Sequence, residues 1–577
     1  MILRYIKLAI IAFFLAAFTF ILLFSFRAIN QDADAVGYAY STKTGTYMFH
    51  PHHLLYIPVL RIFFLALSSF CTSCGALFAG QVHNILWAVI TVLLFFFIAR
   101  RFLNSAFMGV LAALLFLVTQ GFWWASTQNL PYIPATGALA LLVAFLVFCG
   151  PSRAGLGKAA VISLLLAASV FYHQANILFC IPLGYYLICA GGKKGTKAFA
   201  TVIVLTGLIV LSAYVLVVAM STHGEWDIYK LVEFLLGYAS RQQPGWGTFK
   251  NFSSKCVDIF LDGGLWSIAY FPYCMRPVIG CMFTWFIAIV IVWNIIQSMR
   301  KAPYGKVRGL LVLWLISYAL FFLWWMPWEK KYQIMILFPA LLLIFLGLRD
   351  VIDILRNHDY IRGFTSGAAI VAVIAIAGMN FSKTILPQHQ LTSKGYREAA
   401  RLNNLAPADC LICADYETKQ CMAYYFDRKK VFVLQDSLLC FYQGRPLPNK
   451  YRFVKHEKCI VVHVTYITPG YICLTNGYED PTGWLKFMEW IFDFEYDPQH
   501  RLIRCRQFDM KNVEEGGLYI FLHSSKMDVD GFKGLCKILD NRVEKFIGDK
   551  AILFQGWYYS LPVLRGMTAE QFLQKAR

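Results

Sequence analysis

Near its N-terminus the chain reads Asp32-Ala-Asp34-Ala-Val-Gly-Tyr38 and then His50-Pro51-His52-His53, directly after an apolar segment at residues 6–26. That segment is about long enough to cross a bilayer, and no small-residue cleavage site follows it. We therefore expect a retained membrane span followed by a water-facing loop at residues 28–53. Carboxylates and imidazoles at the lip of a span favour a chemical site over a plain hydrophobic scaffold.

The composition indicates a polytopic membrane protein. Hydrophobic residues make up 58% of the chain and charged residues 15%, and the mean hydropathy is +0.55. These values lie outside the range of soluble domains.

Further apolar runs of spanning length predict about eleven transmembrane helices in total. They begin near Val82, Ala106, Leu130, Ala159, Ile177, Ala198, Val278, Leu310, Ile334 and Phe364. Basic residues gather in alternate loops, as the positive-inside rule requires of cytoplasmic loops: Arg4/Lys7, Arg100/Arg101, Arg153/Lys158, Lys193/Lys194/Lys197, Arg300/Lys301/Lys306/Arg308 and Arg349/Arg356/Arg362. The loop at 28–53, the loop at 221–277, residues 328–331 and everything after about residue 382 then lie outside.

Residues 54–70 do not fit this count, because the run is short and contains Arg61. We expect a helix lying at or partly inside the outer interface. The net charge of +20 needs no nucleic-acid partner, since the cytoplasmic loops supply much of it and no basic, aromatic-interleaved module is present. Anionic lipid headgroups are the simpler partner.

The last third of the chain has shorter apolar runs broken by charges, Pro and Gly, which predicts a soluble α/β domain at 383–577 beside a membrane domain at 1–382. Residues 410–414 read as a strand, Tyr416–Phe426 as a helix and residues 430–434 as the next strand. Residues 460–464 and 518–522 could extend the same sheet. No Gly-rich phosphate-binding loop stands at these turns, so a nucleotide site is not expected.

Sixteen cysteines are scattered along the chain. Cys71-x-x-Cys74 and Cys410-x-x-Cys413 each have the spacing of half a zinc site, but no second pair follows at a suitable distance. Packing or disulfide roles are therefore favoured for both.

The outer loops supply the candidate site residues. Asp34 and Asp32 are candidate general bases, although acids just after a span can also be ordinary solvated residues. Substrate contact, metal binding and a structural role stay open for His50, His52 and His53. Further substrate-binding candidates on the outer side are Tyr38, His173, Arg276, Glu329, Lys330 and Lys331. For the segment at 325–331, interfacial anchoring by Trp and Lys is the alternative.

The order of these features resembles the GT-C superfamily of polyprenyl-phosphate-sugar-dependent glycosyltransferases, including its protein mannosyltransferase and aminoarabinose transferase branches. Those families often read Asp-Glu-x-x-Tyr, then His-Pro-Pro, then a span closing in Ala-Arg-Arg and an apolar residue. Here Asp34-Ala-Val-Gly-Tyr38, His50-Pro51 and Ala99-Arg-Arg-Phe102 match. Ala35 replaces the second acid, His52 replaces the second Pro, and a lysine often found after His-Pro is missing. By this resemblance Asp34 takes the base role better than Asp32.

The resemblance implies inverting transfer of a sugar from a polyprenyl-phosphate carrier to a glycan, lipid or protein acceptor, with His50 and Lys330 or Lys331 holding the phosphate. No obligatory cofactor is expected, and a divalent metal is left open. The short loops favour a bacterial inner membrane with a periplasmic C-terminal domain. The alternatives are a transporter or flippase of lipid-linked sugars, which would show mid-membrane charges and paired repeats, and a non-catalytic membrane anchor.

Overall fold

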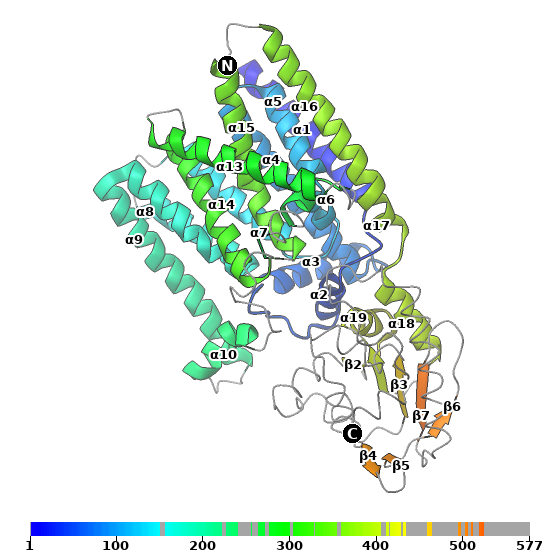
Figure 1. Cartoon of the computed structure of the whole chain (residues 1–577). Coiled ribbons are helices and arrows are strands. Elements are labelled where there is room, and N and C mark those ends of the chain that lie inside the picture. The colour runs from blue at the N-terminus through cyan, green and yellow to red at the C-terminus, as the bar shows by residue number, and fades with distance from the viewer. Residues whose placement is uncertain are drawn as a thin grey trace. The chain divides into compact units, whose positions relative to one another are not determined.

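The computed structural model divides into two compact units, Met1–Thr392 and Ser393–Arg577, and Figure 1 shows the elements of each. It describes residues 2–150, 156–221, 227–240, 255–256, 263–271, 276–300, 304–327, 329–354, 359–405, 411–414, 416–428, 431–433, 459–463, 494–497, 502–505, 509–511 and 519–523.

The first unit is helical wherever it has regular structure in the described ranges. Its long helices are α1 (Ile2–Ser25), α4 (Ala76–Leu103), α5 (Ala106–Val118), α7 (Tyr132–Cys149), α8 (Leu156–Tyr172), α9 (Cys180–Ser221), α13 (Arg276–Met299), α14 (Gly305–Trp325), α15 (Ile334–Ile354) and α16 (Asp359–Asn380). Between them lie α2 (Ala33–Thr44), α3 (Tyr56–Phe70), α6 (Gln120–Ser126), η1 (Gln174–Phe179), α10 (Ile228–Ser240), α12 (Leu265–Ile268), η4 (Lys330–Gln333), η5 (Phe381–Ile385) and α17 (Leu386–Gln390).

Eight helices among the described residues are long and apolar enough to cross a membrane, or nine if α5 and α6, bent by 68°, form one broken span. The chain is therefore a multi-pass membrane protein. Helix occupies each of the eleven predicted segments, but α8 is a shorter apolar helix and α9 covers two of the segments. The number of spans remains a prediction.

Helix α9 reverses direction at Gly192, whose φ of +52° lies in the left-handed region. Residues eight apart in a straight helix are separated by about 12 Å. Here a side chain on Gly195 would collide with the backbone carbonyl of Leu187. The chain therefore folds back on itself, and glycine is needed both for the turn and for the close approach.

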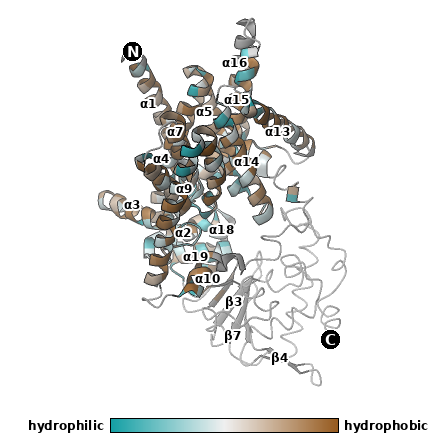
Figure 2. Ribbon diagram, turned by 90° about the vertical axis from the view of Figure 1, so that its left-hand side faces the viewer, coloured by the Kyte–Doolittle hydropathy of each residue, from teal (hydrophilic) through white to brown (hydrophobic). Residues whose placement is uncertain are grey.

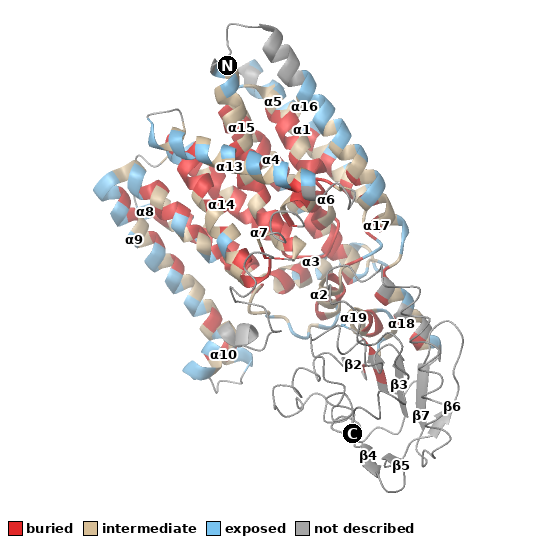
Figure 3. Ribbon diagram, viewed as in Figure 1, coloured by how far each residue is buried: buried red, intermediate tan, exposed pale blue. Residues whose placement is uncertain are grey.

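Aromatic packing fills the centre of the helical unit, where buried residues concentrate (Figure 3). Phe95 of α4 stacks on Phe116 of α5 with ring centroids 4.6 Å apart and meets Phe338 of α15 edge-on at 5.1 Å. Apolar residues also cover outer faces of the bundle (Figure 2), including Phe13 and Phe14 of α1, which are 68% and 65% exposed. Such faces suit contact with lipid hydrocarbon.

Residues from the predicted cytoplasmic loops meet at one end of the bundle. The Tyr304 hydroxyl donates to the Arg101 carbonyl at 2.9 Å, and the Arg349 guanidinium lies 5.2 Å from the centre of the Tyr304 ring. The carboxyl end of α4, the start of α14 and the last turns of α15 therefore share one side, as the alternating basic loops predict.

Helix α3 covers residues 56–70 of the apolar run that did not fit the span count. It has 15 residues, too few for a typical span. Just after it, Cys71 and Cys74 form a disulfide, one of the two roles expected for this pair. Cys410 of the second Cys-x-x-Cys pair lies outside the described residues.

In the second unit the described elements are α18 (Lys394–Leu405), α19 (Tyr416–Phe426) and the strands β1 (Leu411–Ala414), β2 (Val431–Val433), β3 (Cys459–His463), β4 (Phe494–Asp497), β5 (Leu502–Cys505), β6 (Asp509–Lys511) and β7 (Tyr519–His523). One sheet has the order β2-β1-β3-β7-β6, and β4 pairs with β5 separately. Strand β1 runs parallel to β2 and β3, and β7 runs antiparallel to β3 and β6. β1, α19 and β2 coincide with the predicted strand, helix and strand.

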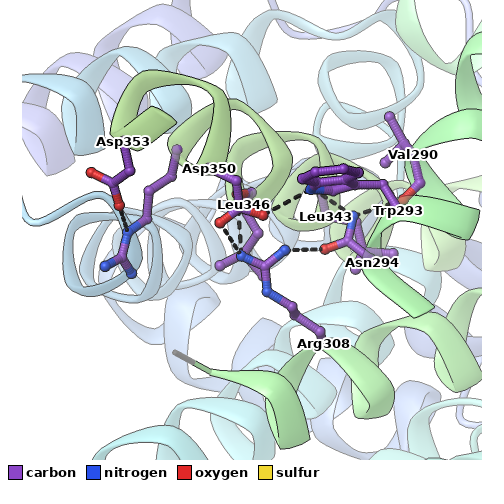
Figure 4. A network of polar contacts seen from close by, with 9 residues as sticks. Val290, Trp293, Asn294, Arg308, Leu343, Leu346, Asp350 and Asp353 are labelled. Carbon is purple, nitrogen blue, oxygen red and sulfur yellow. Dashed lines mark hydrogen bonds and ion pairs between the residues drawn. The ribbon is translucent and has the colours of Figure 1, made fainter. Parts of the chain in front are cut away.

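A buried ion pair fastens three helices of the first unit together (Figure 4). Arg308 of α14 bonds Asp350 of α15 at 2.7 Å and donates to the Asn294 side-chain oxygen of α13 at 2.9 Å. The Trp293 indole donates to the other Asp350 oxygen at 2.8 Å. The Arg308 side chain is only 1% exposed, so its charge depends on these partners.

Replacing Arg308 by Ala leaves Asp350 without its cation, and we expect a loss of about 3 kcal/mol in unfolding free energy. The matched control is Arg349→Ala, because Arg349 pairs with Asp353 one turn away with side chains 22% and 40% exposed. That change should cost less than about 1 kcal/mol. Unfolding by SDS titration of the purified protein measures both, and equal losses would contradict the assignment.

Candidate active site

Both ends of helix α2 are capped by residue types that suit a helix end. Asp32 is the N-cap, and its carboxylate accepts a hydrogen bond from the Asp34 backbone N–H at 2.9 Å. At the other end Gly45 has φ +75°, and its N–H donates to the Ser41 carbonyl at 2.8 Å. An acidic N-cap and a left-handed glycine are the usual ends of a helix. The cap thus fixes Asp32 and Asp34 in the first turn.

Arg61 of α3 closes the carboxyl end of α2. Its guanidinium donates to the Thr42 carbonyl at 2.7 Å and reaches the Lys43 carbonyl at 3.5 Å. A cation at this end satisfies carbonyls that have no partner within the helix and interacts favourably with the helix dipole. This contact explains why a charged residue occurs in the otherwise apolar α3, and it joins α3 to the helix that carries the acids.

A second segment brings Lys331 to the acids. Lys331 lies in η4, and its ammonium is 2.7 Å from the Asp34 carboxylate, 3.7 Å from Asp32 and 4.0 Å from Glu329. The Lys331 side chain is 10% exposed, whereas the three carboxylates are 24% to 32% exposed. Asp32, Asp34, Glu329 and Lys331 together are called the acidic site below.

The acidic site holds three carboxylates around one ammonium. Loss of surrounding water raises the pKa of Asp32, and Asp34 raises it further, while Lys331 opposes both effects. The pKa of Glu329 is raised for the same first reason, with Lys331 again opposing and Asp32 and Asp34 adding to the rise. Because like charges at this spacing disfavour full ionisation, the site is suited to accept a proton.

Four histidine rings gather beside α2. His50 and His53 are stacked with centroids 5.3 Å apart, and His53 lies 4.8 Å from His173. The His52 ring is 5.5 Å from that of His50 and tilted by 41°. Tyr38, one helical turn after Asp34, meets His53 edge-on at 6.0 Å. The structure thus brings the His-Pro segment, His173 and the α2 tyrosine together.

Hydrogen bonds to these rings assign their tautomers. His50 Nδ1 accepts from the His52 N–H at 3.2 Å, and His173 Nδ1 accepts from the Ala175 N–H at 3.2 Å. Each ring therefore carries its proton on Nε2 and can donate from there. His53 Nδ1 faces the Tyr172 carbonyl at 3.2 Å, which places the His53 proton on Nδ1.

Burial keeps the histidines neutral. It lowers the pKa of His50 to about 4, with Asp34 opposing, and lowers that of His52 to about 3, helped by His50. The pKa values of His53 and His173 are also far below the ordinary value, mainly because of burial. Neutral imidazoles of this kind contribute hydrogen bonds and not positive charge.

The remaining predicted residues are placed differently. Lys330, next to Lys331, lies with its ammonium 5.8 Å from the centre of the Trp266 ring of α12, so the two neighbouring lysines have different surroundings. Arg276 is the first residue of α13, but its side chain lies outside the described residues, as does Trp328.

Three residues that were not predicted from the sequence lie beside the acids and the histidines. Gln128 and Asn129, between α6 and α7, contact the loop around Asp32, and Tyr132 of α7 lies 5.5 Å from His173. The available signal was a short polar run, Ser126-Thr-Gln-Asn129, between two apolar segments.

Throughout the described ranges, no group of three or more His, Cys, Asp or Glu side chains has the arrangement of a metal site. The histidine rings stack or tilt against one another and do not converge on one point.

Among the solved structures that share the fold of this chain are two transferases. ArnT from Cupriavidus metallidurans, bound to undecaprenyl phosphate, matches with a TM-score of 0.53 and 11% identity over 89% of this chain and 98% of that one. An Archaeoglobus fulgidus oligosaccharyltransferase in complex with zinc and sulfate matches with a TM-score of 0.51 and 12% identity over 84% of this chain and 72% of that one. Both are GT-C proteins, so the resemblance is confirmed at the level of the fold. No family model and no curated protein matches the sequence.

The lowered pKa values predict a loss of stability in mild acid. Between pH 6.5 and about 4, His50 and His52 bind protons in the unfolded chain but stay neutral in the native state. The free energy of unfolding therefore falls as the pH drops below 6.5. Each proton contributes up to about 1.4 kcal/mol per pH unit. Thermal unfolding between pH 7 and pH 5 should therefore show a steeper decline for the wild type than for the double variant H50Q/H52Q. Equal slopes for the two proteins would contradict the conclusion that His50 and His52 are neutral in the native state.

Proposed function

We propose that this chain is an inverting glycosyltransferase that moves a sugar from a polyprenyl-phosphate carrier to an acceptor on the outer face of the membrane. The observation that carries the proposal is the 2.7 Å pair between Asp34 and Lys331, which joins the first loop to the segment before α15 on a GT-C fold. The undecaprenyl phosphate bound to ArnT supports a carrier of this chemical class.

Asp34 is the proposed base. Its carboxylate takes the proton of an acceptor hydroxyl or amine, and the freed lone pair forms a bond to the anomeric carbon. Attack comes from the face opposite the phosphate, so the bond from the anomeric carbon to the phosphate oxygen breaks as the new bond forms. The electron pair leaves on that oxygen, and the products are the inverted glycoside and polyprenyl phosphate.

Lys331 couples the two charge changes of this step. Before transfer its ammonium balances the Asp34 carboxylate at 2.7 Å. When Asp34 accepts the proton it becomes neutral, and at the same moment the leaving phosphate gains a negative charge. The Lys331 ammonium then stabilises the charge on the leaving phosphate. Electrostatic stabilisation of developing charge is usually the largest contribution to lowering the barrier of such a transfer. The Nε2–H groups of His50 and His173 supply neutral donors beside it.

The location of the site follows from the positive-inside rule as a further part of the proposal. The acidic site lies at the opposite end of α15 from Arg349, which belongs to a predicted cytoplasmic loop. We place the acidic site on the periplasmic face of a bacterial inner membrane. The second unit, as a periplasmic α/β domain, would bind the acceptor.

Asp34→Asn tests the base directly. The amide keeps the shape of the side chain but cannot take a proton, so transfer should fall at least about 100-fold. The measurement is mass analysis of envelope lipids and glycans from cells that lack the gene and carry each variant, following the sugar that the deletion removes. Asp353→Asn, at the far end of α15, is the control. Undiminished transfer by D34N, at equal protein level, would remove Asp34 from the chemistry.

The two lysines provide a matched pair for the second role. Lys331→Met removes the only cation within 4.0 Å of the three carboxylates among the described residues, and transfer should fall about 100-fold. Lys330→Met, beside Trp266, should cost less than about tenfold because it changes only a long-range charge. The same mass analysis measures both, and a larger effect at Lys330 would reverse the assignment.

A further inference from the structure

The segment between α6 and α7 bonds the backbone of residues 30–35, which are called the acid loop below. The side-chain oxygen of Gln128 accepts from the Asp32 N–H at 2.8 Å, and the Gln128 side-chain nitrogen donates to the Asn30 carbonyl at 3.0 Å. One amide group thus bonds the chain on both sides of Gln31. A bracket of this kind fixes both the position and the direction of the peptide that leads into α2.

Asn129 adds three bonds. Its backbone N–H donates to the Gln31 side-chain oxygen at 3.2 Å, its side-chain nitrogen donates to the Ala35 carbonyl at 2.9 Å, and its side-chain oxygen accepts from the Tyr56 hydroxyl at 2.7 Å. Asn129 therefore ties the first turn of α2 to α3. The Asn129 side chain therefore bonds α2 through its nitrogen and α3 through its oxygen.

Helix α4 anchors this segment in turn. The Asn84 side chain donates to the Gln128 carbonyl at 2.7 Å and to the Leu130 carbonyl at 2.6 Å. Asn84 and Asn129 are fully buried, and Gln128 is 1% exposed. Gly80 makes room, because a side chain there would overlap the Asn129 amide. Buried amides are costly when unpaired, so satisfied ones define a single arrangement.

The bonds of Gln128 and Asn129 to the acid loop reach backbone atoms and the Gln31 side chain. The carboxylates of Asp32 and Asp34 face Lys331 instead. The uncharged amides of Gln128 and Asn129 therefore position the loop, and the charged side chains face one another in the acidic site. Amides suit this positioning because they can bond the backbone without altering the charge of the site.

We propose that Gln128 and Asn129 are positioning residues that hold Asp34 in register for proton transfer. The proposal rests on the function proposed above, in which Asp34 is the base. A displacement of about 1 Å at a catalytic group can cost about 100-fold in rate, and the 2.8 Å bond from Asp32 to Gln128 acts only two residues from Asp34.

The first test is hydrogen–deuterium exchange of the full-length protein in detergent, which needs no substrate. Gln128→Ala and Asn129→Ala should speed exchange at the backbone amides of residues 32–36 by about tenfold, because each lost buried bond contributes about 1.4 kcal/mol or more. Gln120→Ala is the matched control, since Gln120 is 2% exposed in the adjoining α6 and its side-chain oxygen has no hydrogen-bond partner among the described residues. Gln120→Ala should leave the exchange rates at residues 32–36 unchanged.

The second test is kinetic, with the lipid-linked sugar identified by the deletion. Gln128→Ala should lower kcat about 100-fold while KM changes less than about threefold, because the base is misplaced and the binding groups are not. Gln120→Ala should retain the wild-type kcat and KM.

The pH dependence of activity in Gln128→Glu distinguishes a positioning role from a purely structural one. A protonated Glu can accept from the Asp32 N–H and donate to the Asn30 carbonyl as Gln does, and burial raises the pKa of such a carboxyl. Once ionised, it loses the donor and repels Asp32. The variant should match the wild type at low pH and lose activity as the pH rises, where the wild type does not.

The outcomes separate the two proposals. Faster exchange at residues 32–36 in the variants, without sugar transfer by the wild type, would overturn the function and the role in proton transfer, and would keep only the anchoring of residues 32–36. Wild-type transfer with unchanged exchange and kcat in both Gln128→Ala and Asn129→Ala would overturn the positioning role and keep the function. An unaltered pH profile for Gln128→Glu would also count against positioning.

Discussion

One ammonium shared by three carboxylates is the constraint on which the site depends. Lys331 contacts Asp34 at 2.7 Å, Asp32 at 3.7 Å and Glu329 at 4.0 Å, so the pair with Asp34 is the shortest of the three. An ion pair that is partly withdrawn from water is stable only while its geometry is maintained. Three features of the fold maintain it. A capped helix holds two of the acids, a short helical turn holds the lysine, and the buried amides of Gln128 and Asn129 bond the loop of the acids.

Long-range connections supply that rigidity. Asp34 and Lys331 are 297 positions apart in sequence, and Gln128 and Asn129 lie between them in the chain. Helix α15, which follows Lys331, is fastened at its other end by the Arg308–Asp350 pair to α14 and through Asn294 to α13. Polar contacts therefore secure α15 near both ends, while aromatic packing around Phe338 fills the middle.

The sequence alone predicted the helical segments, a helix within residues 54–70 and the GT-C resemblance, because apolar run length and the order of motifs are local properties. It could not predict that Lys331 rather than Lys330 meets the acids. That choice depends on the direction of one turn, η4, relative to a loop nearly three hundred residues away. Gln128 and Asn129 were missed because uncharged amides in a short polar run look like an ordinary connection. Their meaning lies in partners that only the folded chain brings near.

Gly80 has a consequence for how this protein can change over evolutionary time. The absence of a side chain on α4 is what admits Asn129 to its place against α2 and α3. Even a single added methyl group at position 80 would overlap the Asn129 amide and so displace the support of the acids. Positions 80 and 129 are therefore expected to change together and not one at a time.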